Sequence, residues 1–293
     1  MEPRPESLIC PRCGKLISGY LEECSYCGLA NPAGKQRLLG LLGLNQGSLV
    51  RLLIGTNILF FGLSYLLPVL LPSLPTQGGR GFMGLLPGPS SASLALLGWA
   101  DPRAIWAGQY HLLLTAVFLH GGFLHIIFNM LWVRDLGSQA EAILGPRLMV
   151  LVFLLSGALG NLLAVFWPAV AISLGMDDHF APVVGASGAV FGLMGAIMAY
   201  APKLGHYAAS SLARQMGRWA LVLVLLGFLI PGVSNTAHIG GFIGGWLLGK
   251  LIPLRMSLTA RVLLEGGGLL MLLLTGASFL YQFTQAARFL GLI

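Results

Sequence analysis

The sequence predicts an all-α fold, a bundle of membrane-spanning helices with a small cysteine-containing domain at the N-terminus. Hydrophobic residues make up 56% of the 293 positions and charged residues only 9%, whereas charged residues are about 25% of an average soluble domain. Uncharged runs such as 54–74 and 219–248 are long enough for the about 20 residues that cross a bilayer core. All four cysteines lie between Cys10 and Cys27. These observations indicate a multi-pass membrane protein with one local cysteine site.

Residues 1–34 are expected to form a small zinc ribbon. Their cysteines form two C-x-x-C pairs, each followed by a glycine, and are Cys10, Cys13, Cys24 and Cys27. Two such pairs supply the four thiolates of a tetrahedral structural Zn²⁺ site. Disulfides are the alternative, which a reducing cytoplasmic location disfavours. The role of the ribbon stays open among binding a cytoplasmic protein partner, sensing metal or redox state, and capping the N-terminus.

Seven membrane spans follow from the positions of the apolar runs. Residues 35–48 link the ribbon to the first span, six spans form a core over 49–253, and 254–293 hold the seventh span and the C-terminus. The expected spans are 49–72, 117–136, 147–168, 186–201, 217–233, 236–253 and 262–284. A cleavable signal peptide is not expected, because charges and cysteines interrupt residues 1–40 where a leader needs an apolar region.

The distribution of basic residues predicts a cytoplasmic N-terminus and an outer C-terminus. With that orientation, only three of the 17 Lys and Arg residues fall on the outer side, namely Arg80, Arg103 and Arg288. This asymmetry obeys the positive-inside rule, which the reverse orientation would violate. The net charge of +7 is therefore attributed to topology, and no nucleic-acid partner is expected. The short loops and the compact ribbon favour a bacterial plasma membrane.

The first outer segment, 73–116, is too long for a simple turn between two helices. It is rich in Gly, Pro and Ser as far as Gly88 and becomes apolar at Leu94. Trp99 and Trp106 suit the headgroup layer of a bilayer. We therefore expect this loop to lie partly in the membrane interface.

A serine at the start of the fourth span is the first candidate for chemistry. Ser187 follows Gly185 and precedes Gly188. At a helix start, backbone N–H groups and the positive end of the helix can stabilise an oxyanion, and glycines let a substrate backbone approach. The alternative is that these small residues only permit close helix packing, which is their commoner use in membranes.

A histidine near the start of the sixth span, His238, lies on the same outer side as Ser187 in this topology. A stripe of small residues at every fourth position is expected to bring spans four and six into contact, formed by Gly241, Gly245 and Gly249 on one span and by Gly188, Gly192 and Ala196 on the other. That contact would bring the imidazole to the serine hydroxyl, as nucleophilic catalysis requires. A histidine buried for structure alone is the alternative, although ionisable groups inside membranes are more often functional.

The second span is expected to carry His120, His125 and Asn129. His125 and Asn129 are four residues apart and would share a helix face. Two neutral donors directed at one point are what a tetrahedral oxyanion needs beside the nucleophile's own N–H. Metal binding by His120, His125 and His238 is the competing hypothesis, disfavoured because these spans carry neither carboxylate nor thiolate on the outer side.

The helix-start serine, the distant histidine before a glycine stripe, and the His-x4-His-x3-Asn segment together resemble the rhomboid family of intramembrane serine proteases. The resemblance covers about residues 49–253, and the seventh span is similar to the family's six-plus-one arrangement. It implies that Ser187 is the nucleophile, His238 its base, and His125 with Asn129 part of the oxyanion hole near Gly185. It also implies that His120 helps to tether the first outer loop.

Two positions bear on how closely the chain follows this family. Many members carry a Trp-Arg pair where this chain has His111-Leu112, so the loop anchor provided by that arginine is missing or replaced. Phe191, one turn after Ser187, occupies a position where the family often has an aromatic residue that stacks on the base. Its alternative role is ordinary core packing.

The resemblance implies a serine endopeptidase that cuts transmembrane protein substrates in the bilayer. Because Asp135, Glu141 and Glu265 fall toward the inner ends of their spans, a Ser-His dyad without a third carboxylate is expected. No cofactor is expected for catalysis. The alternative function is a rhomboid-like protein that binds or escorts membrane clients without cutting them. A transporter is disfavoured, since no charged residue lies at mid-membrane as a coupling site.

Overall fold

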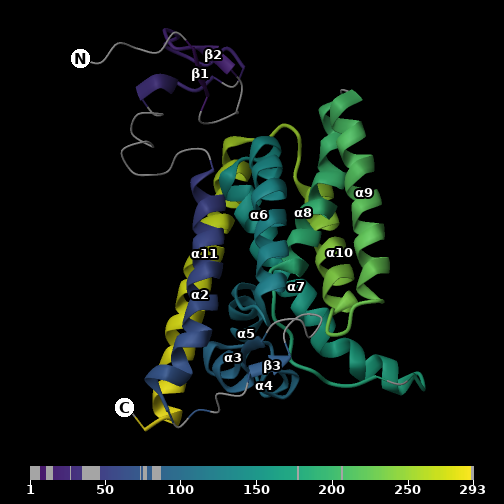
Figure 1. The fold of residues 1–293 in the computed structure, drawn as a ribbon. Coiled ribbons are helices and arrows are strands. Elements are labelled where there is room, and N and C mark those ends of the chain that lie inside the picture. The colour runs from purple at the N-terminus through teal and green to yellow at the C-terminus, as the bar shows by residue number, and fades with distance from the viewer. Residues whose placement is uncertain are drawn as a thin grey trace.

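The computed structural model describes residues 7–10, 16–26, 28–34, 47–72, 74, 78–80, 87–176, 178–205 and 207–291. Within this part of the chain, seven helices of 14 residues or more form a bundle (Figure 1). Each predicted span overlaps one of them, which confirms the predicted helical fold. Their bounds are α2 (Ser48–Leu70), α6 (Phe123–Leu144), α7 (Pro146–Ser173), α8 (Ser187–Tyr200), α9 (Tyr207–Gly227), α10 (Asn235–Leu251) and α11 (Leu258–Phe289).

Three of these helices, α2, α7 and α11, are by themselves long and apolar enough to cross a membrane. The described residues hold a fourth such span if the bent pair Leu112–Phe118 and Phe123–Leu144 counts as one, with its two parts meeting at 95°. α8 has only 14 residues, so it rises about 21 Å against a hydrocarbon core of about 30 Å. The fourth predicted span is therefore a helix that starts at Ser187 and is shorter than the hydrocarbon core is thick.

The span predicted at 117–136 has the wrong bounds. The chain forms two short helices, α5 (Leu112–Thr115) and η2 (Ala116–Phe118), before a turn, and α6 then runs from Phe123 to Leu144. An apolar run does not reveal a bend of 95° within it. His120 consequently lies in the turn and not on the helix that carries His125.

The start predicted for the span at 217–233 is too late in the chain, because α9 begins at Tyr207. Arg214 and Arg218 lie on its exposed face, where a charged side chain does not interrupt a helix. When a span is predicted from hydropathy, the polar first half of α9 is left out, although the helix includes it.

The outer loop folds into short elements that cover one end of the bundle (Figure 1). Ahead of α5 and η2 they are β3 (Gly78–Arg80), β4 (Pro87–Ser90), α3 (Ser91–Leu97) and α4 (Pro102–Trp106). Ser90 caps α3 and Asp101 caps α4, each through its side-chain oxygen. Leu97 and Ile105 are buried, so the loop is packed against the helices.

Helix α8 lies at the centre of the bundle and contacts α10 through bare backbone. Cβ atoms built on three α10 glycines would stand between 2.6 and 3.0 Å from α8 Cα atoms, in the pairs Gly241 with Gly188, Gly245 with Gly192 and Gly249 with Ala196. Real Cβ atoms essentially never come closer than 3.0 Å. The predicted contact along the two stripes of small residues is thus confirmed.

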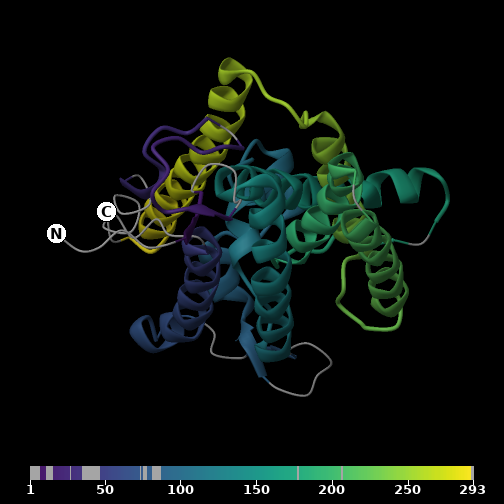
Figure 2. The same ribbon diagram turned by 90° about the horizontal axis from the view of Figure 1, so that it is seen from above.

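The two edges of the bundle are formed by different pairs of helices. Seen from above, α2 and α11 lie together on one side, and α9 and α10 lie on the other (Figure 2). Phe60 of α2 stacks on Phe279 of α11, with ring centroids 3.8 Å apart and planes inclined by 17°. This pairing places the C-terminal helix next to the outer loop, since α3 and α5 also pack on α11.

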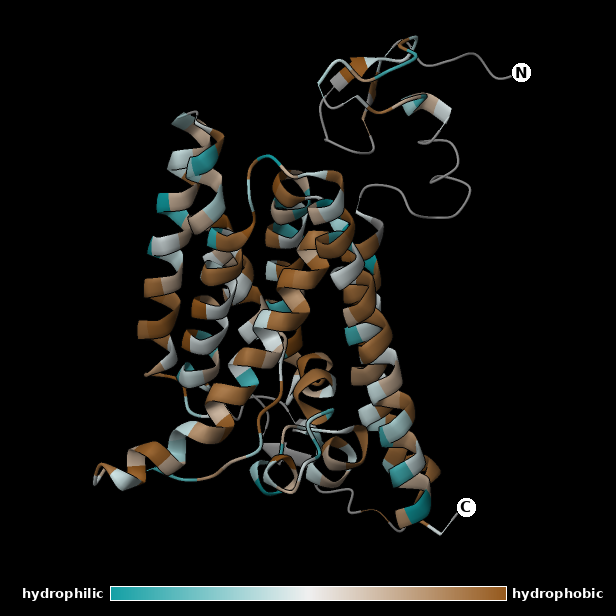
Figure 3. Ribbon diagram, turned by 180° about the vertical axis from the view of Figure 1, so that it is seen from behind, coloured by the Kyte–Doolittle hydropathy of each residue, from teal (hydrophilic) through white to brown (hydrophobic). Residues whose placement is uncertain are grey.

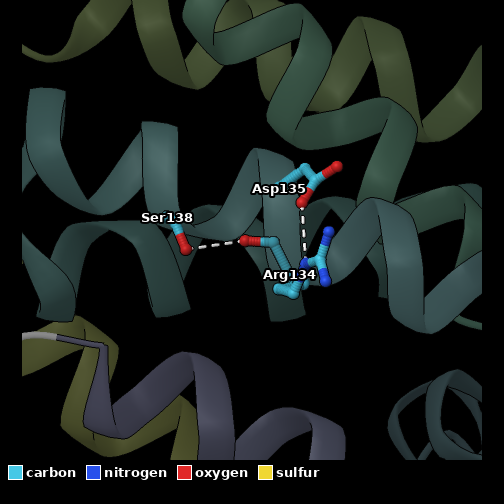
Figure 4. Close-up of polar contacts among 3 residues, drawn as sticks. All are labelled: Arg134, Asp135 and Ser138. Atoms are coloured by element: carbon cyan, nitrogen blue, oxygen red, sulfur yellow. Dashed lines mark hydrogen bonds and ion pairs between the residues drawn. The ribbon is translucent and has the colours of Figure 1, made fainter.

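Hydrophilic residues gather toward one end of α9, as the hydropathy colouring shows (Figure 3). Arg134 Nε donates to Asp135 Oδ1 at 2.9 Å on α6, and Ser138 donates to the carbonyl of Arg134 (Figure 4). Glu265, near the start of α11, pairs with Arg147 near the start of α7 at 3.2 Å. These exposed pairs contribute little stability, but they mark the end of the bundle opposite His238.

The described part of the N-terminal domain is a small hairpin with a buried centre. Strands β1 (Ser7–Ile9) and β2 (Leu16–Ser18) pair antiparallel. Cys10 and Cys24 are buried together with Leu8, Ile17 and Leu29. Cys13 and Cys27, which complete the two predicted pairs, lie outside the described residues.

The glycine contact predicts a specific sensitivity to added volume. We expect Gly245→Ala to lower the free energy of unfolding by about 1–3 kcal/mol, because the new methyl group meets the α8 backbone and forces the helices apart. Reversible unfolding in mixed detergent micelles measures this value.

The matched control is Gly62→Ala in α2, where nothing lies within 4 Å of the added Cβ. Since alanine favours a helix by about 1 kcal/mol over glycine, this variant should be as stable as the parent or more so. Equal stability of both variants would contradict the close packing of α8 on α10.

Candidate active site

The first turn of α8 is held in place by hydrogen bonds to the outer loop. The backbones of Ala100 and Val183 form an antiparallel bridge, with N–H···O distances of 3.0 and 3.1 Å. Two residues later, the N–H of Gly185 donates to the carbonyl of Ala116 at 2.9 Å. The segment that leads to Ser187 is therefore tied to the loop before the helix begins.

The N–H groups at the start of α8 are available to an incoming anion. The first bond within the helix runs from the N–H of Val190 to the carbonyl of Ala186, at 2.9 Å. The earlier N–H groups of Ser187, Gly188 and Ala189 have no partner within the helix, as at every helix N-terminus. They point toward the half-buried Ser187 end of the helix, so a negative oxygen placed there would meet several donors.

Gly185 has a backbone conformation that only glycine adopts readily, with φ at 131°. A Cβ at this position would stand 2.8 Å from both Cε1 and Nε2 of His125 and 3.7 Å from Oγ of Ser187. The edge of the His125 ring therefore packs directly on the Gly185 backbone, next to the serine hydroxyl. The structure thus brings together three of the predicted site residues.

The tautomer of His125 follows from its backbone contact. The N–H of Gly121 donates to Nδ1 of His125 at 3.4 Å. A neutral imidazole that accepts at Nδ1 carries its proton on Nε2. The Nε2–H of His125 is therefore a donor at the ring edge that faces Gly185.

Asn129 uses one of its two amide N–H groups within its own helix. Its side-chain Nδ2 donates to the carbonyl of His125 at 2.8 Å. A carbonyl one turn back is the nearest acceptor for a buried amide in an apolar helix. The other N–H group remains for a ligand, and the expected common target of Asn129 and His125 stays a prediction.

His120 lies beside His125 although it is not on α6. It is 1% exposed, and its ring centroid is 5.0 Å from that of His125. Within the described part of the chain, neither of its ring nitrogens has a hydrogen-bond partner. Its predicted role as a tether of the outer loop stays a prediction.

His238 lies in the first turn of α10 and is held by an aromatic ring. Ser234 caps this helix, with its Oγ accepting from the N–H of Ala237 at 3.3 Å. The His238 ring stacks on Phe191 of α8, with centroids 4.3 Å apart and planes inclined by 11°. The stacking position suggested for Phe191 is therefore confirmed, and it fixes the plane of the imidazole.

The starts of α8 and α10 are in contact at the level of the two candidate catalytic residues. The carbonyl oxygen of Ala237 would be 3.3 Å from a Cβ on Gly188, so the residue before His238 touches the residue after Ser187. Among the described residues, no hydrogen bond joins Ser187 to His238, and Nδ1 of His238 has no partner. Catalytic hydrogen bonds are often long before substrate binds, and the dyad stays a prediction.

Three described carboxylates accept hydrogen bonds from backbone N–H groups. Asp101 accepts from the N–H of Arg103 at 2.8 Å, and Asp178 accepts from that of His179 at 2.7 Å. Glu141, near the end of α6, accepts from the N–H of Gly47 at 2.7 Å. None of these contacts involves His238, and the Ser-His dyad stays a prediction.

Sequence reasoning missed the polar residues that join the outer loop to the helices. Asn161 of α7 donates to the carbonyl of Leu113 at 3.0 Å, and Gln282 of α11 bonds to the loop at several points. Their signal in the sequence is a single uncharged polar residue within a long apolar helix. That signal names no partner, because the partners are distant in the chain.

The geometry defines the chain as a polytopic helical membrane protein in which Ser187 and His238 lie in the first turns of two contacting helices near one end of the bundle. The residues gathered there, Ser187, His238, Gly185 and His125, are called the niche below. A family profile for the rhomboid domain matches residues 107–255, which is just over half of the chain. The chain belongs to the rhomboid family.

Curated relatives agree with this assignment. RHOMBOID-like protein 4 of Arabidopsis thaliana is 35% identical over 170 residues, covering 57% of this chain and 41% of the relative. RHOMBOID-like protein 5 of the same plant is 34% identical over 175 residues, or 58% and 53% of the two chains. Rhomboid protease GluP of Bacillus subtilis is 29% identical over 174 residues, or 56% and 30%. The chain thus spans about half or less of the length of these relatives.

The contact between Gly185 and His125 yields a prediction for the shape of the site. We expect Gly185→Ala to lower the free energy of unfolding by about 1–3 kcal/mol, since the methyl group is strained at this φ and meets the imidazole. Gly121→Ala serves as the control, because it keeps the N–H that bonds His125 and the nearest atom is a Val184 methyl at 4.0 Å. If the two variants unfold alike in mixed micelles, the ring does not pack on Gly185.

Proposed function

We propose that this protein is an intramembrane serine endopeptidase that hydrolyses peptide bonds in or near transmembrane segments of membrane proteins. Membership of the rhomboid family supports the proposal at the level of class. Two relatives are named as proteases, GluP of Bacillus subtilis and Rhomboid-like protease 3 of Toxoplasma gondii, the latter 30% identical over 160 residues.

The observation that carries the proposal is the crowding of donors around the start of α8. The hydroxyl of Ser187 lies beside Gly185, on whose backbone the His125 ring edge packs, and the first-turn N–H groups of α8 have no partner within the helix. Structural packing alone explains the small residues, but it does not require an imidazole donor at this point. Hydrogen-bond donors that are already in place before the reaction stabilise an oxyanion.

The proposed reaction starts when Oγ of Ser187 attacks the scissile carbonyl carbon and His238 takes the hydroxyl proton. The resulting oxyanion accepts from the first-turn N–H groups and from His125, with Asn129 as a further donor. The C–N bond then breaks, and His238 returns its proton to the leaving amine. Water hydrolyses the acyl-enzyme by the same route, releasing the second product and restoring the hydroxyl.

His238 acts in this scheme without a carboxylate partner. Stacking on Phe191 holds the ring plane, whereas an Asp in a triad would fix both the tautomer and the plane. Because no carboxylate fixes the tautomer of His238, we expect a modest turnover rate. Ser187 lies at the start of a short helix. This position suits the entry of substrate from the bilayer and of water from the outer side.

The proposed topology places the N-terminus in the cytoplasm and the C-terminus outside. The ion pairs and exposed arginines described above then face the cytoplasm, in agreement with the positive-inside rule. We propose the plasma membrane of a bacterium as the location, with transmembrane proteins as substrates.

A second function, binding or escorting membrane clients without cutting them, is favoured by the contacts of His238. Among the described residues, its Nδ1 has no partner and no hydrogen bond joins it to Ser187. Both functions use the same fold and differ only in whether substrate completes the contact between serine and histidine.

Covalent labelling by a fluorophosphonate separates the two functions. In proteoliposomes, the parent chain should react, Ser187→Ala should not, and His238→Ala should react at least about 100-fold more slowly, the usual range for loss of a general base. The same variants are then assayed on a single-span model substrate by the appearance of shortened product.

The controls are Ser173→Ala at the end of α7 and His179→Ala in the outer turn, both exposed and outside the niche. They should label and cleave like the parent. Equal cleavage by Ser187→Ala and the parent would refute the proposed mechanism, whereas a parent that binds the substrate without shortening it would leave client binding as the function.

For the N-terminal domain we propose a structural Zn²⁺ held by Cys10, Cys13, Cys24 and Cys27. Support comes from the burial of Cys10 and Cys24 in one cluster, and from the turn in which the N–H of Gly28 donates to the carbonyl of Cys24 at 2.9 Å.

Metal analysis of the full-length protein tests this site. We expect one zinc per chain, a large loss in Cys24→Ser, and no loss in Ser25→Ala, which alters a residue between the same cysteines. Chelation should leave fluorophosphonate labelling unchanged, as should deletion of 1–40, because the niche lies in the helical bundle. A full-length protein without bound zinc would refute the ribbon.

A further inference from the structure

Gln282, within the apolar helix α11, is bonded to the outer loop at several points. It is 8% exposed. Its Nε2 donates to the carbonyls of Ala95 and Leu96 at the end of α3, at 3.2 and 3.0 Å. Its Oε1 lies 2.9 Å from Nε2 of His111 at the start of α5. One side chain thus joins the seventh helix to both ends of the segment between α3 and α5.

The direction of each bond is determined by chemistry. The carbonyls of Ala95 and Leu96 can only accept, so the amide NH₂ must face them and Oε1 must face His111. His111 therefore donates through Nε2. Its ring also packs edge-on against Tyr281, with centroids 4.8 Å apart and planes inclined by 84°.

A second bond closes the same segment from within. Thr115 Oγ1 donates to the carbonyl of Gly98 at 2.6 Å. Gly98 has φ at 96°, and a Cβ there would stand 2.7 Å from Thr115 Oγ1 and 3.1 Å from Cγ of Gln282. The turn after α3 is therefore packed between Thr115 and the side chain from α11.

This segment continues directly into the niche. Ala116, the residue after Thr115, accepts from the N–H of Gly185, and Ala100, two residues after Gly98, is bridged to Val183. The backbone that precedes Ser187 is thus bonded at two points to the loop that Gln282 holds. A shift of the loop would move the start of α8 relative to α10.

We propose that Gln282 is a positioning residue for the proposed protease, holding the outer-loop segment 95–116 so that Ser187 stands correctly against His238 and His125. The inference rests on the proposed function. Many rhomboids carry a Trp-Arg pair at the positions of His111 and Leu112, and this chain anchors its loop through a seventh-helix amide instead. Gln282 acts through the backbone and touches no reacting atom.

The decisive variant is Gln282→Met, which keeps the length and burial of the side chain and removes its hydrogen bonds. We expect the rate constant of fluorophosphonate labelling at saturating probe to fall between about 10- and 100-fold, because a small displacement of catalytic groups has effects of this size. His111→Phe keeps the ring contact with Tyr281 and removes one bond, so it should lose less.

Ser278→Ala on the same helix is the matched control. Ser278 is 7% exposed. Its Oγ donates to the carbonyl of Leu274 within α11 at 2.7 Å, and among the described residues it makes no hydrogen bond to the outer loop. We expect it to lower the melting temperature about as much as Gln282→Met while labelling at the parent rate. Parent-rate labelling of Gln282→Met, or an equal loss in Ser278→Ala, would overturn the proposal.

Hydrogen exchange separates failure of this inference from failure of the proposed function. In Gln282→Met, but not in Ser278→Ala, amide protection should fall at Gly98 and Gly185. Gly98 lies in the segment that Gln282 holds, and the N–H of Gly185 donates to Ala116 of that segment. This readout requires no catalysis. If the parent protein does not label but the exchange pattern appears, the protease proposal fails and the positioning of the loop stands; unchanged exchange in Gln282→Met refutes the positioning itself.

Discussion

The contact between α8 and α10 is the constraint on which the rest of the structure depends. Between helices in a bilayer, lipid tails remove most of the hydrophobic driving force, so van der Waals contact must supply the attraction. Glycines on α10 allow the two backbones to touch along the length of α8. That contact places the first turns of both helices at the same depth, where Ser187 and His238 are found.

Polar side chains within the bundle divide into two groups with different consequences. Asn129, Thr275 and Ser278 each bond to a carbonyl of their own helix, which satisfies the group but joins no elements. Asn161 and Gln282 instead bond to carbonyls of the outer loop. Asn161 and Gln282 thus join two helices to the loop that is bonded to the segment before Ser187, where a rigid arrangement matters for placing a nucleophile.

Residues near one another in sequence were predicted better than residues that meet only in the fold. The small-residue stripes follow from helical spacing, the stacking position of Phe191 follows from the family resemblance, and the structure confirms both. His120 was assigned to a helix because an apolar run does not show where it bends. Asn129 was assigned a shared target with His125, but the carbonyl one turn back takes one of its N–H groups.

The sequence by itself determined the membrane class, the approximate helices and the residue types available for chemistry, because each depends on hydropathy, spacing and side-chain chemistry along short segments. Only the tertiary structure decided that the His125 ring edge packs on Gly185, that the loop is bonded to the segment before Ser187, and that Gln282 reaches that loop from the far end of the chain. The physical reason is that a hydrogen bond needs a partner at one place in space, and a residue's type records its capacity to bond but not where that partner lies.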